Sequence, residues 1–146
     1  MPTASAILED GTIVEMAFDP KQRRTVFAIY NAGRLTLQDA IDLGSDTRLV
    51  PFSPNNNLLK NEVVTLPSEP SIYGSEEHLV ADIEQFIHRY VDFSTSFEKV
   101  ATYYVLLTGL YDAFNEAYLR LRGDYGSGKT RALLTLGSLC YRGFFR

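Results

Sequence analysis

The chain is poor in residues that form covalent or metal crosslinks, with one cysteine and two histidines among 146 residues. The lone Cys140 excludes an internal disulfide, and the histidines lie too far from it in sequence to suggest a zinc site. The N-terminus lacks the basic start and apolar run of a signal peptide. The longest apolar-rich run, residues 100–111, is too short to cross a bilayer. These absences predict a soluble, cytoplasmic protein with no membrane partner.

Acidic residues outnumber basic ones, but the two kinds are unevenly distributed. The net charge is −4, and 45% of the residues are hydrophobic, which is enough to build a core. The length predicts one domain, or one small domain with part of another. After residue 118, basic residues outnumber acidic ones. This excess predicts binding of phosphate, either of a nucleotide or of a DNA backbone, and the sequence does not decide between the two. From there on, Asp124 is the one acidic residue against Arg120, Arg122, Lys129, Arg131, Arg142 and Arg146.

One stretch near the C-terminus carries a pattern for binding phosphate. Gly123, Gly128, Lys129 and Thr130 complete the spacing G-x-x-x-x-G-K-[ST], the Walker A motif. Glycines let the backbone curl so that successive N–H groups point into one concavity. The helix that begins at the loop brings the positive end of its dipole to the same place. Lys129 then supplies a charge for the β- and γ-phosphates, and the Thr130 hydroxyl can bind Mg²⁺.

The candidate site residues follow from the roles of the motif positions. Lys129 and Thr130 are the candidate catalytic residues, and Thr130 is also the candidate metal ligand through its hydroxyl. Backbone N–H donors come from Gly126, Ser127 and Gly128. The candidate nucleotide-binding residues are Gly123, Asp124, Tyr125, Gly126, Ser127, Gly128, Lys129, Thr130 and Arg131.

These residues also carry a resemblance to known proteins. The motif resembles the phosphate-binding loop of the P-loop NTPases. More narrowly, residues 123–131, followed by Leu133 and Leu134 and then by residues 137–142, resemble the ATPase segment of replication and helicase-type proteins of phages and mobile elements. The resemblance implies binding of ATP or another NTP with Mg²⁺, and hydrolysis of the γ-phosphate coupled to a conformational change. It also implies DNA and further copies of the protein as candidate partners.

The first part of the chain, residues 1–66, predicts a β-rich domain without recognisable chemistry. Asp10-Gly11 is typical of a hairpin turn, and consecutive short strands with tight turns predict an antiparallel meander. Residues 67–74 are rich in proline and glycine, which predicts a linker. The predicted strands are residues 5–8, 12–18, 24–30, 34–37, 47–52 and 58–66.

Residues 75–117 predict a helical region. The first helix begins after Ser75, a good N-cap, and shows an apolar stripe at helical spacing. The second helix extends to about residue 115 and begins with a capping-box pattern, in which Glu98 reaches back to the N-cap Thr95. Because this second segment is apolar nearly all round, it is typical of a buried helix.

Residues 118–146 predict the first strand–loop–helix unit of a P-loop α/β domain, with its strand at residues 118–121 and its helix at residues 131–140. Only sixteen residues follow Thr130, which leaves no room for the strand that carries the Mg²⁺-binding carboxylate in such folds. The predicted class is therefore α+β with an incomplete P-loop domain. We expect the chain to be an N-terminal fragment of a longer ATPase, with weak nucleotide affinity and no hydrolysis by itself.

Two other functions remain open. A kinase acting on a nucleotide or small molecule uses the same loop, although such kinases usually begin near it. A non-catalytic interaction module would bind a partner through the β-rich region and the second helix. The tyrosines of that helix, Tyr103, Tyr104 and Tyr111, suit either base stacking or a core with polar rims. His88 borders the apolar stripe of the first helix, which is more typical of a surface histidine than of a catalytic base.

Overall fold

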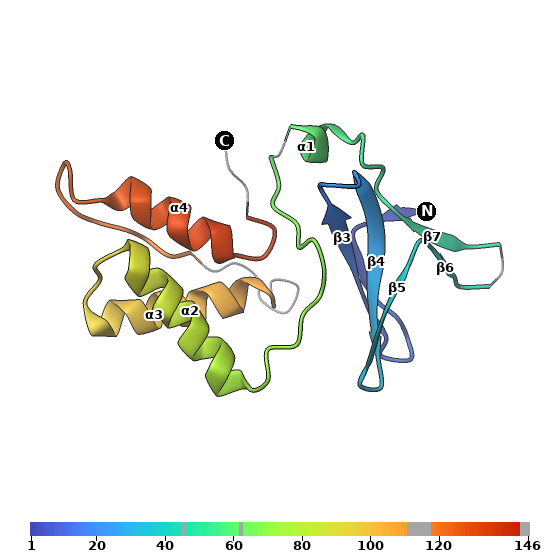
Figure 1. Ribbon diagram of the computed structural model, residues 1–146, viewed down its shortest axis with the longest axis horizontal. Coiled ribbons are helices and arrows are strands. Elements are labelled where there is room, and N and C mark those ends of the chain that lie inside the picture. The colour runs from blue at the N-terminus through green and yellow to red at the C-terminus, as the bar shows by residue number, and fades with distance from the viewer. Residues whose placement is uncertain (45, 62, 111–117, 144–146) are drawn as a thin grey trace. The chain divides into compact units, whose positions relative to one another are not determined.

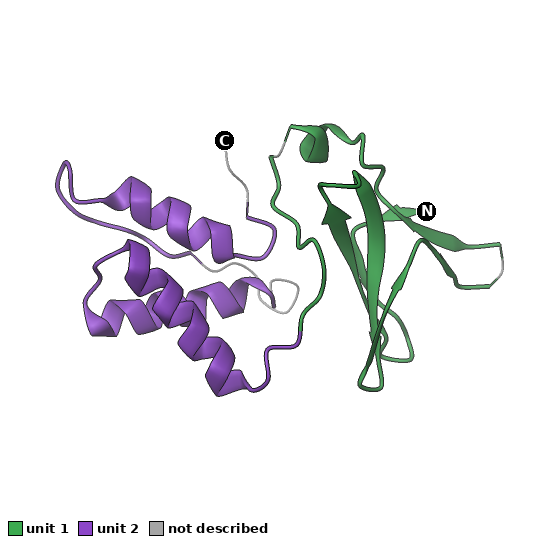
Figure 2. Ribbon diagram, viewed as in Figure 1, with its two compact units in different colours: residues 1–71 green, residues 72–146 purple. Residues whose placement is uncertain are grey.

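The computed structural model describes residues 1–44, 46–61, 63–110 and 118–143. The chain divides into two compact units, Met1–Ser71 and Ile72–Arg146 (Figure 2). The division falls inside the segment 67–74. The described strands all belong to the first unit, and three of the four described helices belong to the second (Figure 1). The predicted mixed α and β class is therefore confirmed.

A four-stranded antiparallel sheet forms much of the first unit. The turn before its second strand is held by Asp10, which accepts hydrogen bonds from the N–H and the hydroxyl of Thr12, both at 2.9 Å. Gly11 adopts a left-handed backbone there, with φ of 81°. Each strand pairs with the next in sequence, so the predicted meander is confirmed. The strands are β2 (Ser5–Ile7), β3 (Ile13–Asp19), β4 (Arg24–Asn31) and β5 (Arg34–Gln38) (Figure 1).

The first unit also contains a three-stranded sheet. Its central strand, β7 (Arg48–Pro51), confirms the strand predicted at residues 47–52. It pairs in parallel with β1 (Pro2–Thr3) and antiparallel with β6 (Ile41–Asp42). The sequence did not predict the two outer strands, because two residues are too few to form a periodic pattern.

The strand predicted at residues 58–66 is wrong. The chain instead forms the short helix α1 (Asn57–Lys60), and only Val64 makes an isolated bridge. The N-cap of α1 is Asn56, whose side chain accepts a hydrogen bond from the N–H of Leu58 at 2.9 Å. Leu59 then reaches the core from the helix. Local capping by an asparagine therefore overrides the β propensity of the valines that follow.

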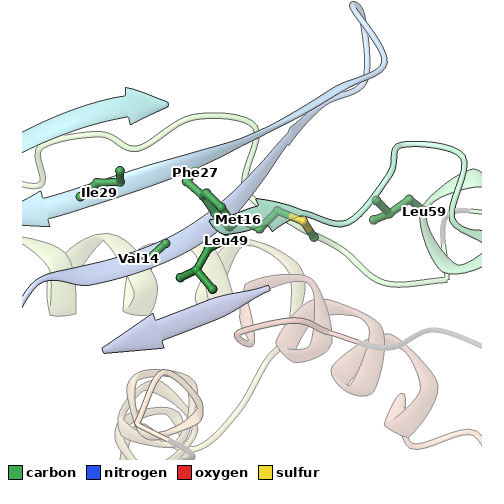
Figure 3. Packing of buried hydrophobic residues seen from close by; sticks show 6 residues of the cluster. All are labelled: Val14, Met16, Phe27, Ile29, Leu49 and Leu59. Carbon is green, nitrogen blue, oxygen red and sulfur yellow. The ribbon is translucent and has the colours of Figure 1, made fainter. Parts of the chain in front are cut away.

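Both faces of the four-stranded sheet carry apolar side chains, but the large buried ones lie on one face. On the opposite, more exposed face, register aligns four residues across the four strands, and each side chain is at least 42% exposed. These are Ile7, Ile13, Tyr30 and Leu35. The buried core lies on the other face and consists of Val14, Met16, Phe27 and Ile29 from the sheet, Leu49 from β7 and Leu59 from α1 (Figure 3).

The second unit contains α2 (Glu76–Tyr90), α3 (Thr95–Thr108) and α4 (Lys129–Leu139) (Figure 1). Helix α2 begins as predicted, because Ser75 Oγ accepts a hydrogen bond from the N–H of His78 at 3.2 Å. No helix among the described residues is long and apolar enough to cross a membrane.

The predicted start of α3 is wrong by one residue. Its N-cap is Ser94, whose Oγ accepts from the N–H of Phe97 at 3.4 Å, and Thr95 is already helical. The helix ends at Thr108, with Gly109 as C-cap, so the predicted extension does not continue through residues 109–110. The rest of that extension, residues 111–117, lies outside the described residues.

The core of the second unit joins all three helices. It contains Ile83 and Ile87 from α2, Ala101 and Val105 from α3, and Leu136 from α4. The prediction that α3 is buried nearly all round is wrong, because Val100 is 53% exposed and Tyr103 is 59% exposed. In the described part of the unit, α3 has only α2 and α4 as helical neighbours, so much of its surface stays open.

The segment before α4 differs from prediction. Residues 118–124 form no strand, so the strand predicted at residues 118–121 is wrong for this structure. A strand needs the backbone of a neighbouring strand, and every strand in the described residues lies between residues 2 and 51. Leu119 instead packs against the helical core. The helix predicted at residues 131–140 is confirmed by α4.

Candidate functional site

The candidate site is the turn that leads into α4, residues 123–128, which we call the glycine loop. Gly126 and Gly128 both have φ of 80°, in the left-handed region that glycine adopts without strain. Between them the chain reverses direction, and the N–H of Ser127 donates to the carbonyl of Asp124 at 3.3 Å. Gly128 is the residue that caps α4. Two of the three glycines are therefore required by backbone conformation.

The third glycine is required by space. A Cβ added to Gly123 would lie 2.5 Å from Oγ of Ser127 and 3.2 Å from its Cβ. Such distances are shorter than van der Waals contact, so any larger residue would displace the serine. The start of the loop thus packs closely against its second half, and the motif spacing corresponds to a physical contact.

The side chain of Lys129 connects residues of the glycine loop by three hydrogen bonds. Its Nζ donates to the carbonyl of Gly123 at 2.8 Å, to the carbonyl of Asp124 at 2.6 Å and to Oγ of Ser127 at 3.1 Å. An ammonium group has three donors, so these three acceptors use its full capacity. The positive charge is therefore held by the loop, at a position that solvent still reaches.

The N-terminus of α4 adds to the positive character of this place. Gly128 provides no side-chain cap, and no acidic residue lies in the first turn. The first intrahelical bond in this turn is from the N–H of Ala132 to the carbonyl of Gly128, at 3.0 Å. The N–H groups before it have no intrahelical acceptor. They point along the helix axis toward the loop, where the dipole favours an anion.

The nine predicted site residues are contiguous, and they take different positions around the loop. Lys129 and Ser127 face each other across it, and Gly123 and Asp124 contribute their carbonyls. Thr130 and Arg131 are exposed in the first turn of α4. Tyr125 is fully exposed, so its side chain forms no wall of the loop.

A pocket of about 340 Å³ adjoins the glycine loop. Ser127 and Lys129 form one end, and the segment between α2 and α3 forms much of the rest. Two aromatic rings there, Phe93 and Phe97, pack edge to face with their centroids 4.8 Å apart. The lining residues are Asp92, Phe93, Ser94, Phe97, Arg120, Leu121, Arg122, Ser127, Lys129 and Ala132.

Sequence reasoning missed the part of this pocket that comes from the start of α3 and the segment before it. Phe93 and Phe97 lie about thirty residues before the loop, and nothing in their spacing relates them to a phosphate site. The available signal was Arg120 and Arg122, whose charges interrupt an otherwise apolar segment. A pair of arginines at that position is expected to line an anionic ligand rather than a core.

The described residues provide few side-chain ligands for an Mg²⁺ ion. They contain no group of three or more histidine, cysteine, aspartate or glutamate side chains that could hold a metal. The candidate metal ligand, Thr130, is exposed and directly follows the loop. This fits Mg²⁺ that arrives with a nucleotide, because the ion takes few protein ligands and several phosphate and water oxygens.

His88 and Cys140, which both belong to the second unit, lie outside the candidate site. His88 contacts Glu98 of α3, at 3.0 Å. Cys140 is half-buried at the end of α4, where burial raises the pKa of its thiol and makes it less reactive.

Comparisons with protein-family models, with curated proteins and with solved structures found no match for this chain.

Proposed function

We propose that residues 123–131 bind the triphosphate of a nucleotide such as ATP. The observation that carries this proposal is the position of Lys129, whose ammonium lies inside the glycine loop at the N-terminus of α4. A phosphate entering the loop offers this ammonium a stronger acceptor than a neutral carbonyl, because both partners of the new bond are charged. The geometry therefore supports a site for an anion that carries several charges.

In this proposal each part of the site has a separate task. Lys129 moves from the loop carbonyls to the phosphate oxygens, while N–H groups of the loop and of the first turn of α4 donate to the same phosphates. The Thr130 hydroxyl would hold Mg²⁺ that accompanies the nucleotide. When bound, that ion neutralises charge on the β- and γ-phosphate oxygens.

The biological process proposed for this site is ATP hydrolysis in DNA replication or unwinding. It rests on the resemblance of residues 123–142 and on the exposed Arg120, Arg122 and Arg131 around the loop, which suit the phosphates of nucleic acid. DNA-stimulated ATP turnover by a longer form of the protein would favour this process. Phosphate transfer to a small acceptor would favour a kinase, and partner binding undisturbed by Lys129→Ala would favour an interaction module.

Titration of the ¹⁵N-labelled chain with Mg²⁺-ATP tests the proposed binding, because NMR detects weak binding residue by residue. We expect the amide signals of residues 123–131 to shift, and Lys129→Ala to weaken binding about tenfold or more through loss of a charge-assisted hydrogen bond. The matched control is Lys99→Ala, which removes an exposed lysine of α3. Equal affinity of Lys129→Ala and the unmodified chain would overturn the proposal.

A further inference from the structure

We propose that the pocket beside the glycine loop holds the sugar and base of the nucleotide, and that it accepts adenine and guanine with similar affinity. This inference rests on the proposed binding of the triphosphate by the loop. It adds an assignment for Phe93, Phe97, Arg120 and Arg122, which the Walker A pattern does not include.

The first argument is continuity. Ser127 and Lys129 line the pocket and also form the inner surface of the glycine loop. A ligand whose phosphates lie against Lys129 therefore has open space next to it within the second unit. The volume of about 340 Å³ lies in the range of small-molecule sites.

The second argument is the chemistry of the walls. Phe93 and Phe97 are held in place because both pack against the helical core, and each ring also supports the other. Aromatic surfaces that are fixed in this way suit stacking with a nucleobase. Arg120 and Arg122 come from the opposite segment and offer guanidinium groups, which stack on bases and bind phosphate oxygens.

The third argument concerns base selectivity. Recognition of a base edge needs polar side chains with free donors or acceptors. In this pocket, the Oγ atoms of Ser94 and Ser127 each already accept one hydrogen bond, from the N–H of Phe97 and from Lys129. Asp92 is the one carboxylate among the lining residues. The two phenylalanine rings would contact the faces of a base, and stacking depends little on which base is present.

A comparison of three ligands separates this inference from the proposal beneath it. Inorganic tripolyphosphate, ATP and GTP, each with Mg²⁺, are titrated into the ¹⁵N-labelled chain. We expect all three to shift the amides of the glycine loop, and only the two nucleotides to shift those of residues 93–97. ATP and GTP should bind within about threefold of each other, and both about tenfold tighter than tripolyphosphate.

Two variants test the aromatic wall. Phe97→Leu and Phe93→Leu keep an apolar side chain against the core and remove the aromatic face, and the NMR spectrum reports whether each variant is folded. Either variant should weaken ATP and GTP about tenfold and leave tripolyphosphate unchanged. The control is Tyr103→Leu, which removes an exposed aromatic of α3 that does not line the pocket.

Each failure has its own signature. If ATP binds no tighter than tripolyphosphate and residues 93–97 do not respond, the base pocket is wrong while phosphate binding by the loop stands. A strong preference for one nucleotide would overturn the similar affinity for adenine and guanine. If none of the three ligands binds in a Lys129-dependent manner, the proposed function fails, and this inference fails with it.

Discussion

Oε2 of Glu98 in α3 lies 3.0 Å from Nδ1 of His88 in α2. The contact joins the last turn of α2 to the first turn of α3, and the glutamate side chain is 17% exposed while the histidine is 71% exposed. It is a hydrogen bond when the imidazole is neutral and an ion pair when it is protonated. Glu98 therefore links two helices instead of capping its own helix.

Removal of this link should lower the stability of the second unit. Glu98→Gln keeps the size of the side chain and removes its charge from the histidine and from the N-terminal turn of α3. We expect the free energy of unfolding, measured with urea, to fall by about 0.5–1 kcal/mol. The control is Glu84→Gln, in the middle of α2. In a double-mutant cycle with His88→Ala, additive effects would show that the contact contributes nothing.

The start of α3 gives a second prediction, which distinguishes two neighbouring residues. Ser94→Ala removes the hydroxyl that accepts from the N–H of Phe97, and should lower the free energy of unfolding by about 0.5–1 kcal/mol. Thr95→Ala changes a residue that is already helical, and should change stability by less than about 0.5 kcal/mol. Urea unfolding of both variants measures the difference. A larger loss from Thr95→Ala would show that the cap is misplaced.

The close approach of Gly123 to Ser127 gives a third prediction. Gly123→Ala should displace the Ser127 side chain, distort the glycine loop and its N–H donors, and weaken nucleotide binding about tenfold. Ser127→Ala removes the Oγ that makes the closest contact with the new methyl group. The double variant should therefore lose less affinity than the sum of the single variants. Strictly additive losses would indicate that the two positions do not interact.

The hairpin turn in the first unit gives a prediction about pH. Hydrogen bonds from the N–H and hydroxyl of Thr12 hold the pKa of Asp10 below its ordinary value. Because the folded chain binds this proton less readily than the unfolded chain, the stabilisation is complete above the unfolded pKa of about 4 and is lost as the pH falls through the folded value.

Thermal unfolding of the chain and of Asp10→Asn between pH 7 and pH 2 measures this effect. The stability difference between the two proteins should be constant near neutrality and should shrink in acid, because the unmodified carboxylate becomes protonated there. A difference that stays the same down to pH 2 would contradict the role assigned to Asp10.

The thiol of Cys140 gives a prediction about reactivity. Burial raises its pKa, and a hydrogen bond to Thr108 offsets only part of that effect. At pH 7 the folded chain should therefore react with a thiol reagent such as iodoacetamide more slowly than the urea-unfolded chain. Equal rates in the two states would show that the thiol is accessible in the folded chain.

Much of the fold could be predicted from sequence where several signals agree. Asp10-Gly11 between apolar strands specified the first hairpin, and Ser75 before a helical stripe specified the start of α2. The failures lie where neighbouring signals compete. Ser94 and Thr95 are both good caps, and only the backbone conformation decides between them.

The distribution of apolar residues sets another limit on prediction. Ile13 and Val14 are neighbours in β3 and equally apolar, yet Ile13 is 46% exposed and Val14 is buried. Successive residues of a strand face opposite sides of a sheet, so the pattern could not identify the covered face. That depends on Leu49 and Leu59, which come from distant parts of the chain.

The candidate site also has one part that the sequence could indicate and another part that it could not. The helix that follows its loop could be predicted, because the motif residues are contiguous, and the binding roles of those residues stay a proposal. Phe93 and Phe97 could not be predicted, because they come from the segment before α3 and from α3, and they line the pocket only through the packing of the helical core. Sequence therefore supports the proposed phosphate site, and the structure adds the pocket beside it.

In the proposed function, the three hydrogen bonds of Lys129 affect which anions can bind in the loop. The carbonyls of Gly123 and Asp124 compete with every incoming ligand for the same ammonium, and being part of the chain they are always present. A singly charged anion such as chloride or acetate replaces them with little gain. A polyphosphate engages the lysine, the loop amides and the helix N-terminus together, and so can displace them. The closed loop would thus bind polyphosphates in preference to the singly charged anions that are abundant in the cell.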